Sequence, residues 1–433
     1  MDELKVLWEV RNGKKFVYLH KFQQQVVEST AKYTFEIAGT GGGKSSLAPI
    51  IIADRMAKMH NSVVIFTEPT TYMLEHIAIP LTENFFKGTY LQGHLSEKVG
   101  DVTYENRFGT ILFRSAEKPD FLEGIHSDLV VADELGQYKR RAWTVLSNRI
   151  TLRDGQFFGL TTPYNRGWMY LEPYHEWKIG NPDYNCVIFP STENPAFPKD
   201  VFENKRKELS EEEFSMRYLA EFIKLRGLVF NYSDTNLEDY TNLDGNKYWT
   251  AMDFGWGHPT AILYFFESRD GKVHAFDEYI ASSEDYEIHV VDNLDRFKKF
   301  DIRRTYYDPS NPQGANEMKK WFKTYGKEDI SFIPAINNVM RGVRSTNTLL
   351  KRHDLLINRP RCPELLNEFE TCIYKGDEPS DDDTDLLDCL RYGILGRESW
   401  IKPVSTAREQ ITLATKHIQG LFGQKKTNWM GDV

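Results

Sequence analysis

The stretch Ala38-Gly39-Thr40-Gly41-Gly42-Gly43-Lys44-Ser45-Ser46 decides the fold of the first half of the chain. It follows an apolar, β-prone run at residues 33–37 and precedes a helical pattern at residues 47–59. A strand, a glycine-rich loop and a helix in this order form a cradle for nucleotide phosphates. Backbone N–H groups and the helix N-terminus attract the phosphates, Lys44 reaches the β/γ oxygens, and Ser45 is placed to ligate Mg²⁺. We therefore predict a nucleotide site at residues 39–46; the alternative is a glycine-rich turn that binds none.

Length and composition limit the class of protein. The chain has 433 residues, of which 40% are hydrophobic, and a formal net charge of −9. This length is typical of two to three domains. A protein whose net charge is negative can still have a basic groove on its surface. The four cysteines contain no CxxC pair, so neither a zinc knuckle nor a disulfide framework is predicted. We find no signal peptide and no 18-residue apolar run, and we therefore expect no membrane segment.

Apolar runs continue beyond the loop at residues 62–67, 110–113, 128–132 and 156–160, with amphipathic stretches between them. Near-continuous apolar strands that alternate with helices indicate an α/β fold with a parallel sheet covered on both faces. Sheets of this kind bind their ligands at the C-terminal ends of the strands. We therefore expect the functional residues of this half at those ends.

Two carboxylates, Asp133 and Glu134, directly follow the run at residues 128–132. We predict that Asp133 holds the water shell of Mg²⁺ and that Glu134 orients or deprotonates the attacking water. An ordinary turn with two acidic residues is the alternative. The position after a phosphate loop favours the catalytic interpretation.

Two further residues of the first half are candidates for nucleotide binding. Thr161 ends the run at residues 156–160, a position that senses the γ-phosphate in helicase-like and translocase ATPases. Gln23 lies 21 residues before Lys44, and its amide can offer adenine both a donor and an acceptor. The alternatives are a simple exit from a strand for Thr161 and a solvated helix start for Gln23.

The pattern changes near residue 246. Residues 248–253 form an apolar strand that ends in Asp253, and the runs at residues 259–266 and 273–280 continue it as an antiparallel meander. A later strand at residues 304–307 leads into Asp308. Near the C-terminus, Asp385 and Asp388 are three residues apart on a predicted helix, so they share one face.

Separated acids at two strand ends and on one helix are the ligands that two-metal phosphodiester cleavage requires. Carboxylate oxygen suits Mg²⁺ or Mn²⁺, and two such ions about 4 Å apart stabilise the attacking and leaving oxygens. We predict Asp253, Asp308 and Asp388 as metal ligands and catalytic residues, with Asp385 as a fourth ligand. The alternative is that the acid-rich run at residues 377–388 is a solvated loop and helix cap.

Basic residues also gather in this half and are candidates for a DNA groove or, equally, for ordinary solvated faces. They are Arg303, Arg304, Lys319, Lys320, Lys323, Arg341, Arg344, Lys351, Arg352, Arg359 and Arg361.

In this order, the motifs resemble the large terminase subunit of tailed double-stranded DNA phages. The resemblance covers about residues 15–400 and includes the strings at residues 191–195, 218–222, 227–230 and 388–392. It implies an N-terminal P-loop ATPase with a mostly parallel sheet and a C-terminal ribonuclease H-like nuclease with a mixed sheet. The implied domains are a motor at residues 1–198, a helical lid and linker at 199–245, a nuclease at 246–400 and a tail at 401–433.

The resemblance also implies a function. ATP with Mg²⁺ would drive double-stranded DNA through a portal protein into the procapsid, and the nuclease, with two Mg²⁺ or Mn²⁺, would cut concatemeric DNA. A ring of five subunits, a small terminase subunit and the host cytoplasm are the implied assembly, partner and location, with no membrane involved. The alternatives are a DNA helicase or repair-type ATPase-nuclease, and a DNA-binding scaffold with a degenerate site. For the tail, both a portal or partner contact and a frayed terminus stay open.

Three positions depart from the family pattern. Ala38 replaces the first glycine of the loop, and Thr384-Asp385 stands where relatives often have Asp-His. Glu123 occupies a position at which several relatives carry an arginine that enters the neighbouring subunit's ATP site. A transition-state arginine must then come from elsewhere, and the candidates are Arg114, Arg140, Arg141, Arg153 and Arg166.

Overall fold

The computed structural model describes residues 8–11, 14–98, 101–224, 227–239, 243, 247–254, 259–282, 285–375, 378–380 and 384–401. The chain forms two compact units, Met1–Val229 with Pro363–Asp381, and Phe230–Cys362 with Asp382–Val433. Apart from residue 401, the predicted tail at residues 401–433 and its suggested partner contact lie outside the described residues. Within the described part of the chain, no helix is both long and apolar enough to span a membrane.

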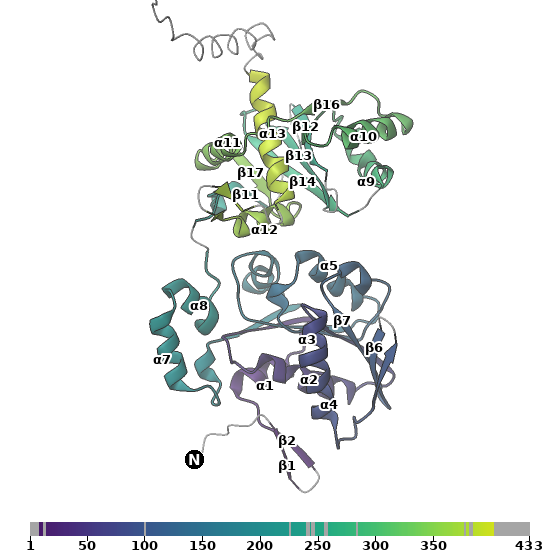
Figure 1. Ribbon diagram of the computed structural model, residues 1–433, viewed down its shortest axis with the longest axis vertical. Coiled ribbons are helices and arrows are strands. Elements are labelled where there is room, and N and C mark those ends of the chain that lie inside the picture. The colour runs from purple at the N-terminus through teal and green to yellow at the C-terminus, as the bar shows by residue number, and fades with distance from the viewer. Residues whose placement is uncertain are drawn as a thin grey trace, which may run out of the picture. The chain divides into compact units, whose positions relative to one another are not determined.

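The first unit is built on an eight-stranded sheet in the order β10-β3-β9-β8-β4-β7-β6-β5 (Figure 1). The five pairings from β10 to β7 are parallel, and β6 and β5 add antiparallel pairs at one edge. This confirms the mostly parallel sheet. The strands are β3 (Tyr33–Ala38), β4 (Ser62–Glu68), β5 (His94–Lys98), β6 (Asp101–Asn106), β7 (Gly109–Ser115), β8 (Leu129–Ala132), β9 (Gln156–Thr161) and β10 (Tyr184–Phe189).

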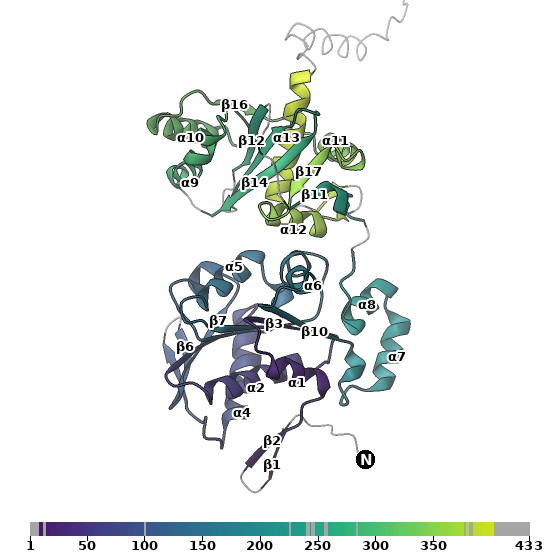
Figure 2. The ribbon, with the colours of Figure 1, turned by 180° about the vertical axis from the view of Figure 1, so that it is seen from behind.

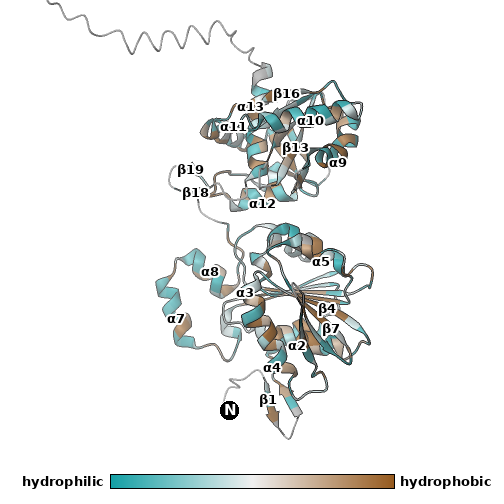
Figure 3. Ribbon diagram, turned by 45° about the vertical axis from the view of Figure 1, so that its right-hand side comes forward, coloured by the Kyte–Doolittle hydropathy of each residue, from teal (hydrophilic) through white to brown (hydrophobic). Residues whose placement is uncertain are grey.

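Helices cover both faces of this sheet, as the near-continuous apolar strands predict. Val64 and Phe66 of β4 face one core, whereas Ile65 between them faces the other. Figure 3 shows hydrophobic residues along the strands around β4. The first face carries α1 (Lys21–Glu28), α2 (Lys44–Met56) and α4 (Ile79–Phe86), and the second carries α5 (Arg140–Arg149). Shorter elements are β1 (Trp8–Arg11), β2 (Lys14–Val17), α3 (Thr71–Met73) and α6 (His175–Lys178).

Helix α2 begins earlier than the sequence predicts, and the predicted helical lid contains two helices. Helix α2 begins at Lys44, three residues before the predicted start, because Gly43 takes the left-handed φ of 97° and turns the chain directly into the helix. The charged segment at residues 199–224 forms two helices, α7 (Lys199–Glu208) and α8 (Glu211–Leu219), shown in Figures 1 and 2. The Ser210 hydroxyl accepts a hydrogen bond from the Glu213 N–H at 3.1 Å and so caps α8.

The second unit has a seven-stranded mixed sheet in the order β11-β17-β14-β13-β12-β15-β16. The predicted meander is confirmed, since β12, β13 and β14 pair antiparallel, and the other pairings are parallel. The strands are β11 (Leu237–Glu238), β12 (Lys247–Asp253), β13 (Thr260–Glu267), β14 (Val273–Ala281), β15 (Arg304–Tyr307), β16 (Ser331–Pro334) and β17 (Leu355–Asn358).

Among the described residues of this unit, four helices accompany the sheet, and the last of them carries candidate site residues. They are α9 (Tyr286–Lys299), α10 (Pro312–Thr324), α11 (Val339–Lys351) and α13 (Asp385–Ile401). Two glycines let α13 lie close to the strands: a Cβ at Gly393 would overlap the Phe265 ring, and one at Gly396 would meet the Tyr306 ring at 2.5 Å. The Trp249 indole donates a hydrogen bond to the Gly393 carbonyl at 3.1 Å. The middle of α13 is therefore held against the sheet, with a hydrogen bond from β12.

One segment of the C-terminal half belongs to the first unit. It contains α12 (Pro363–Thr371) and the short pair β18 (Tyr374–Lys375) and β19 (Glu378–Pro379). Glu364 pairs with Arg140 at 3.2 Å, and the Asn367 side-chain oxygen accepts a hydrogen bond from the Trp168 N–H at 2.9 Å. The predicted domain boundaries at residues 199 and 246 do not include this return of the chain to the first unit.

Candidate functional site

The predicted phosphate loop lies between β3 and α2. Gly41 and Gly43 take left-handed φ values of 78° and 97°, which side chains rarely adopt. The Lys44 side chain is buried, and its ammonium group donates a hydrogen bond to the Thr162 hydroxyl at 2.8 Å. The loop thus presents its lysine towards the C-terminal end of the neighbouring strand β9.

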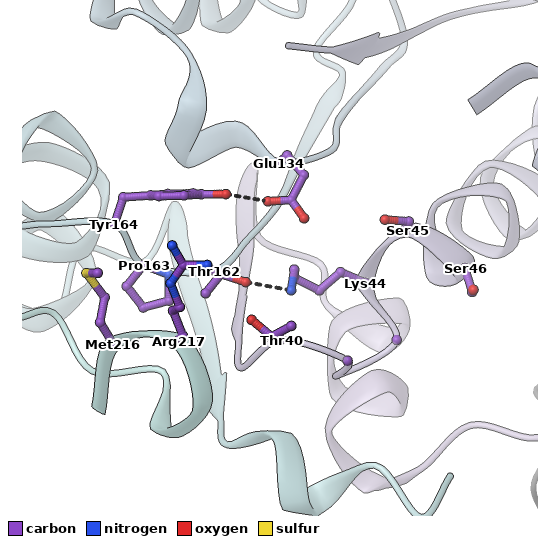
Figure 4. A pocket seen from close by; sticks show the side chains of 12 residues that line it. Thr40, Lys44, Ser45, Ser46, Glu134, Thr162, Pro163, Tyr164, Met216 and Arg217 are labelled. Carbon is purple, nitrogen blue, oxygen red and sulfur yellow. Dashed lines mark hydrogen bonds between the residues drawn. The ribbon is translucent and has the colours of Figure 1, made fainter. Parts of the chain in front are cut away.

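A pocket of about 330 Å³ opens beside this loop (Figure 4). Its size is that of a small-molecule site. From the loop and α2 it is lined by Thr40, Gly41, Gly43, Lys44, Ser45 and Ser46. The opposite walls are Glu134, Thr162, Pro163, Tyr164, Met216 and Arg217. Gly39 and Gly42, the other predicted loop residues, are not part of this lining.

The predicted acid pair stands at the end of β8. Burial raises the pKa of Asp133 to about 6, although a hydrogen bond from the Ser45 hydroxyl opposes the rise. One Asp133 oxygen accepts the Glu134 N–H at 3.0 Å, and the other has no hydrogen-bond partner among the described residues. Because hard oxygen donors suit Mg²⁺, Ser45 and Asp133 fit the predicted role.

Glu134 has an unusual backbone. Its φ of 48° lies in the left-handed region, where the backbone of residues other than glycine is strained. The Tyr164 hydroxyl donates a hydrogen bond to the Glu134 carboxylate at 3.0 Å, and Figure 4 shows the two side chains facing each other across the pocket. The carboxylate is thereby directed into the pocket.

Gln23 and Thr161 lie near the pocket without lining it. The Gln23 amide donates to the Gly43 carbonyl at 3.5 Å and accepts from the His20 N–H at 3.4 Å. The Thr161 hydroxyl accepts the Gly136 N–H at 2.9 Å and donates to the Thr162 carbonyl. The hydroxyl that reaches Lys44 is one residue further on, at Thr162. The roles predicted for Gln23 and Thr161 stay predictions.

Two buried glutamates beside the loop were missed by the sequence analysis. Glu36 on β3 and Glu68 on β4 are fully buried, and none of their carboxyl oxygens has a hydrogen-bond partner in the described part of the chain. Burial raises the pKa of Glu36 to about 8 and that of Glu68 to about 9, and the charge of Asp133 adds to both shifts. Protonated side chains at these positions leave the positive charge of Lys44 available for an anion.

The second unit brings its four predicted acids to one edge of the sheet. Asp253 ends β12, and Asp308 follows the neighbouring parallel strand β15, with its N–H donating to the Met252 carbonyl at 3.2 Å. Asp385 and Asp388 lie in the first turn of α13. Burial raises the pKa of Asp253 to about 8, and the charges of Asp388, Asp308 and Asp385 raise it further. The other three carboxylates are thus within electrostatic reach of Asp253.

Asp388 and Asp308 have partners of their own. Asp388 pairs with Arg391, whose Nε lies 3.1 Å from the aspartate oxygen, and Asp308 accepts the Ser310 N–H at 3.0 Å. In keeping with this, the described residues contain no group of three or more His, Cys, Asp and Glu side chains arranged to hold a metal ion. The donor set still suits a hard divalent cation, which would offset the mutual repulsion of the four acids. Arg391 lies in the quoted family string, but no role was predicted for it.

Several of the basic residues suggested for a DNA groove form ion pairs. Arg341 pairs with Glu398 at 2.9 Å, Arg361 with Asp277 at 2.7 Å and Arg359 with Asp239 at 3.3 Å. These pairs favour the solvated-face alternative at those positions. The DNA groove stays a prediction.

Comparison with known proteins bears on both units. Residues 250–396 match the family model described as the terminase RNaseH-like domain, and this range contains all four clustered aspartates. The chain resembles a phage large terminase. The large terminase subunits of Thermus phage G20c and Thermus virus P23-45 are each 24% identical to it in an alignment of 246 residues, and the match covers 50% of this chain and 51% of each relative. The chain thus spans about half the length of these relatives.

A solved phage protein is also among the structural matches. The large terminase of bacteriophage HK97 matches 91% of this chain and 97% of its own, at 13% identity and a TM-score of 0.49. The predicted α/β fold is confirmed, with a mostly parallel sheet in the first unit and an RNase H-like second unit.

Proposed function

We propose that this chain is the large subunit of a phage DNA-packaging terminase. ATP hydrolysis in the first unit drives double-stranded DNA through a portal into the procapsid, and the second unit cuts concatemeric DNA. The observation that carries the proposal is the presence in one chain of the pocket around Lys44 and of the four aspartates inside the terminase RNaseH-like match.

In the motor site, each lining residue has a task that follows from its contacts. The loop N–H groups and Lys44 bind the nucleotide phosphates, and Thr162 orients the ammonium group through its 2.8 Å hydrogen bond. Ser45 and Asp133 would hold Mg²⁺, which would supply positive charge to neutralise the phosphates. Glu134, oriented by Tyr164, accepts a hydrogen bond from the attacking water.

In the nuclease site, two Mg²⁺ or Mn²⁺ ions would be held by Asp253, Asp308, Asp385 and Asp388, and would supply positive charge for phosphodiester cleavage. Arg391 holds Asp388 at the start of α13 and limits the net negative charge of the cluster. Both cations suit an all-carboxylate site.

Partners and location follow from the resemblance and are part of the proposal. They are double-stranded DNA, a portal protein, a small terminase subunit, a ring of five copies of this chain and the host cytoplasm. The helicase alternative calls for a second motor half, but the second unit has a mixed sheet with an antiparallel meander. The scaffold alternative is disfavoured by the intact set of Lys44, Ser45, Asp133 and Glu134 around one pocket.

The test is a double dissociation of the two activities. ATP turnover and cleavage of supercoiled plasmid with Mg²⁺ or Mn²⁺ are measured for Lys44→Ala and Asp308→Ala. Each has a matched control at an exposed position, Lys58→Ala on α2's C-terminal side and Asp295→Ala on α9. We expect Lys44→Ala to lose only ATP turnover and Asp308→Ala to lose only cleavage, with both controls active. Loss of both activities in either variant, or of neither, would contradict the assignment.

A further inference from the structure

The pocket contains an arginine that the sequence analysis did not select. Of the five arginines considered, Arg153 pairs with Asp128 at 2.9 Å, and the guanidinium of Arg166 lies over the Tyr170 ring at 5.1 Å. None of the five belongs to the described pocket lining, whereas Arg217 of α8 does. Apart from Lys44, the cationic side chain in the described lining thus comes from the helical segment that follows β10.

Helix α8 is attached to the phosphate loop by its backbone. The Thr40 N–H donates to the Arg217 carbonyl at 2.6 Å, and a Cβ at Gly39 would meet the Tyr218 carbonyl at 2.6 Å. The segment before α8 adds two contacts to loop carbonyls, from the Ser191 hydroxyl to Thr40 and from the Asn194 amide to Gly41, both at 2.7 Å. The loop that would hold the phosphates is therefore hydrogen-bonded directly to the backbone of Arg217.

The Arg217 side chain is directed into the pocket. Figure 4 shows it running from α8 towards Thr162 and Pro163. Burial and the charge of Glu134 raise the pKa of Tyr164, and the positive charge of Arg217 opposes this rise. Arg217 is therefore within electrostatic reach of the Tyr164–Glu134 pair that faces Lys44 across the pocket.

The present partner of Arg217 is easily exchanged. Its Nε lies 3.1 Å from the Glu213 carboxylate, one helical turn earlier, and both side chains are exposed. Exposed ion pairs of this kind contribute little to stability, whereas an arginine bound to a phosphate forms stronger, often bidentate hydrogen bonds. A triphosphate in the pocket would compete effectively with Glu213 for the guanidinium group.

We propose that Arg217 binds the terminal phosphate of the nucleotide held by its own chain, and so supplies in cis the positive charge that Glu123 cannot provide. This inference rests on the proposed ATPase function of the pocket. In hydrolysis the water oxygen bonds to the γ-phosphorus, the bond to the β–γ bridging oxygen breaks, that oxygen stays with ADP, and the water proton passes to Glu134. Arg217 stabilises the charge on the γ-phosphate oxygens, and after phosphate release it returns to Glu213. Helix α8 therefore distinguishes ATP from ADP.

The first test compares nucleotide affinity and turnover in the full chain. The variants are Arg217→Ala, Arg217→Lys and, as a matched control, Arg206→Ala on α7, whose guanidinium contacts the Phe214 ring outside the pocket. We expect Arg217→Ala to weaken ATPγS binding at least 10-fold, to change ADP binding less than 3-fold, and to lower kcat by about 10³ or more. The lysine variant should recover part of the ATPγS affinity. Equal weakening of both nucleotides, or no change in either, would overturn the proposal.

The second test decides between action in cis and in trans. Lys44→Ala and Arg217→Ala chains are mixed in equal amounts, and ATP turnover is compared with that of the separate variants. If the arginine acts in cis, each chain in the mixture lacks one residue that its own site needs. The ATP turnover of the mixture should then equal the sum of the turnover of the two separate variants. Recovered turnover would mean that Arg217 of a Lys44→Ala chain serves the intact loop of its neighbour, which contradicts the proposal. Normal turnover in Lys44→Ala alone would instead refute the proposed motor site.

Discussion

Replacing Glu36 by glutamine removes a titratable group from the interior of the first unit and changes its volume little. Glu36 lies in the middle of β3, is fully buried, and its carboxyl oxygens have no hydrogen-bond partner among the described residues. Burial raises its pKa from 4.5 to about 8, against the opposing charge of Lys44. The folded protein therefore keeps a proton on this side chain at pH values where the unfolded chain has released it.

The size of the effect follows from that difference in pKa. Between pH 4.5 and about 8, each increase of one pH unit lowers the free energy of unfolding by about 1.4 kcal/mol, because only the unfolded state gives up the proton. The stability that the protonated side chain contributes is complete below pH 4.5 and is lost as the pH rises to about 8. Glutamine cannot titrate. We therefore expect the free energy of unfolding of Glu36→Gln, relative to wild type, to increase by about 4 kcal/mol between pH 5 and pH 8 and then to level off.

Native-state hydrogen exchange of the β3 amides measures this difference in the full chain. It reports the opening free energy of one region, so it does not require both units to unfold together. Exchange is followed from pH 5 to pH 9 and corrected for the intrinsic pH dependence of amide exchange. The control is Glu28→Gln at an exposed position at the end of α1, for which the difference from wild type should stay constant. A constant difference for Glu36→Gln, or one that falls as the pH rises, would refute the assignment of a buried, protonated Glu36.

Three further substitutions test single contacts. Thr162→Val removes the hydroxyl that accepts from Lys44 and should lower ATP turnover about 10-fold at unchanged thermal stability; a normal rate would exclude a role for that hydrogen bond. Gly43→Ala should abolish nucleotide binding, because φ is 97° and the new Cβ would lie 2.7 Å from the Gln23 amide. Gly124→Ala shares the backbone strain, with a φ of 81°, but nothing lies within 4 Å of its new Cβ and Gly124 is not part of the described pocket lining, so this control should bind normally in the same titration. Arg391→Met leaves Asp388 without this partner and should destabilise the second unit by about 3 kcal/mol, measured by urea unfolding; unchanged stability would argue against a structural role for the ion pair.

Much of the fold could be predicted because its signals are local. The apolar strands β3, β4, β7, β8 and β9 lie within a few residues of their predicted positions, and the acids that end β8, β12 and β15 were identified from the strands before them. Parallel strands end at one edge of a sheet, so Asp133 could be assigned to the pocket side and Asp253 and Asp308 to a common edge without any knowledge of contacts.

The parts that were missed depend on backbone detail or on long-range packing. Thr161 and Thr162 are adjacent hydroxyls, and only the end of β9 decides which of them reaches Lys44. Arg217 lies in a charged helix whose sequence is typical of a solvated surface, and it enters the pocket because α8 is hydrogen-bonded to the loop. Glu36 is a single acid within an apolar strand, and its burial follows from the two cores that cover the sheet.

The most direct test of the account is DNA packaging itself. Procapsids carrying the cognate portal are mixed with linear double-stranded DNA, ATP and purified protein, and DNase-resistant DNA is measured. Because the DNA is already cut, Asp308→Ala should package it as well as wild type does, and Lys44→Ala should package none. Equal protection of the DNA with Lys44→Ala, or no protection by a wild-type protein that still hydrolyses ATP and cleaves plasmid, would contradict the proposal that this chain is a packaging motor.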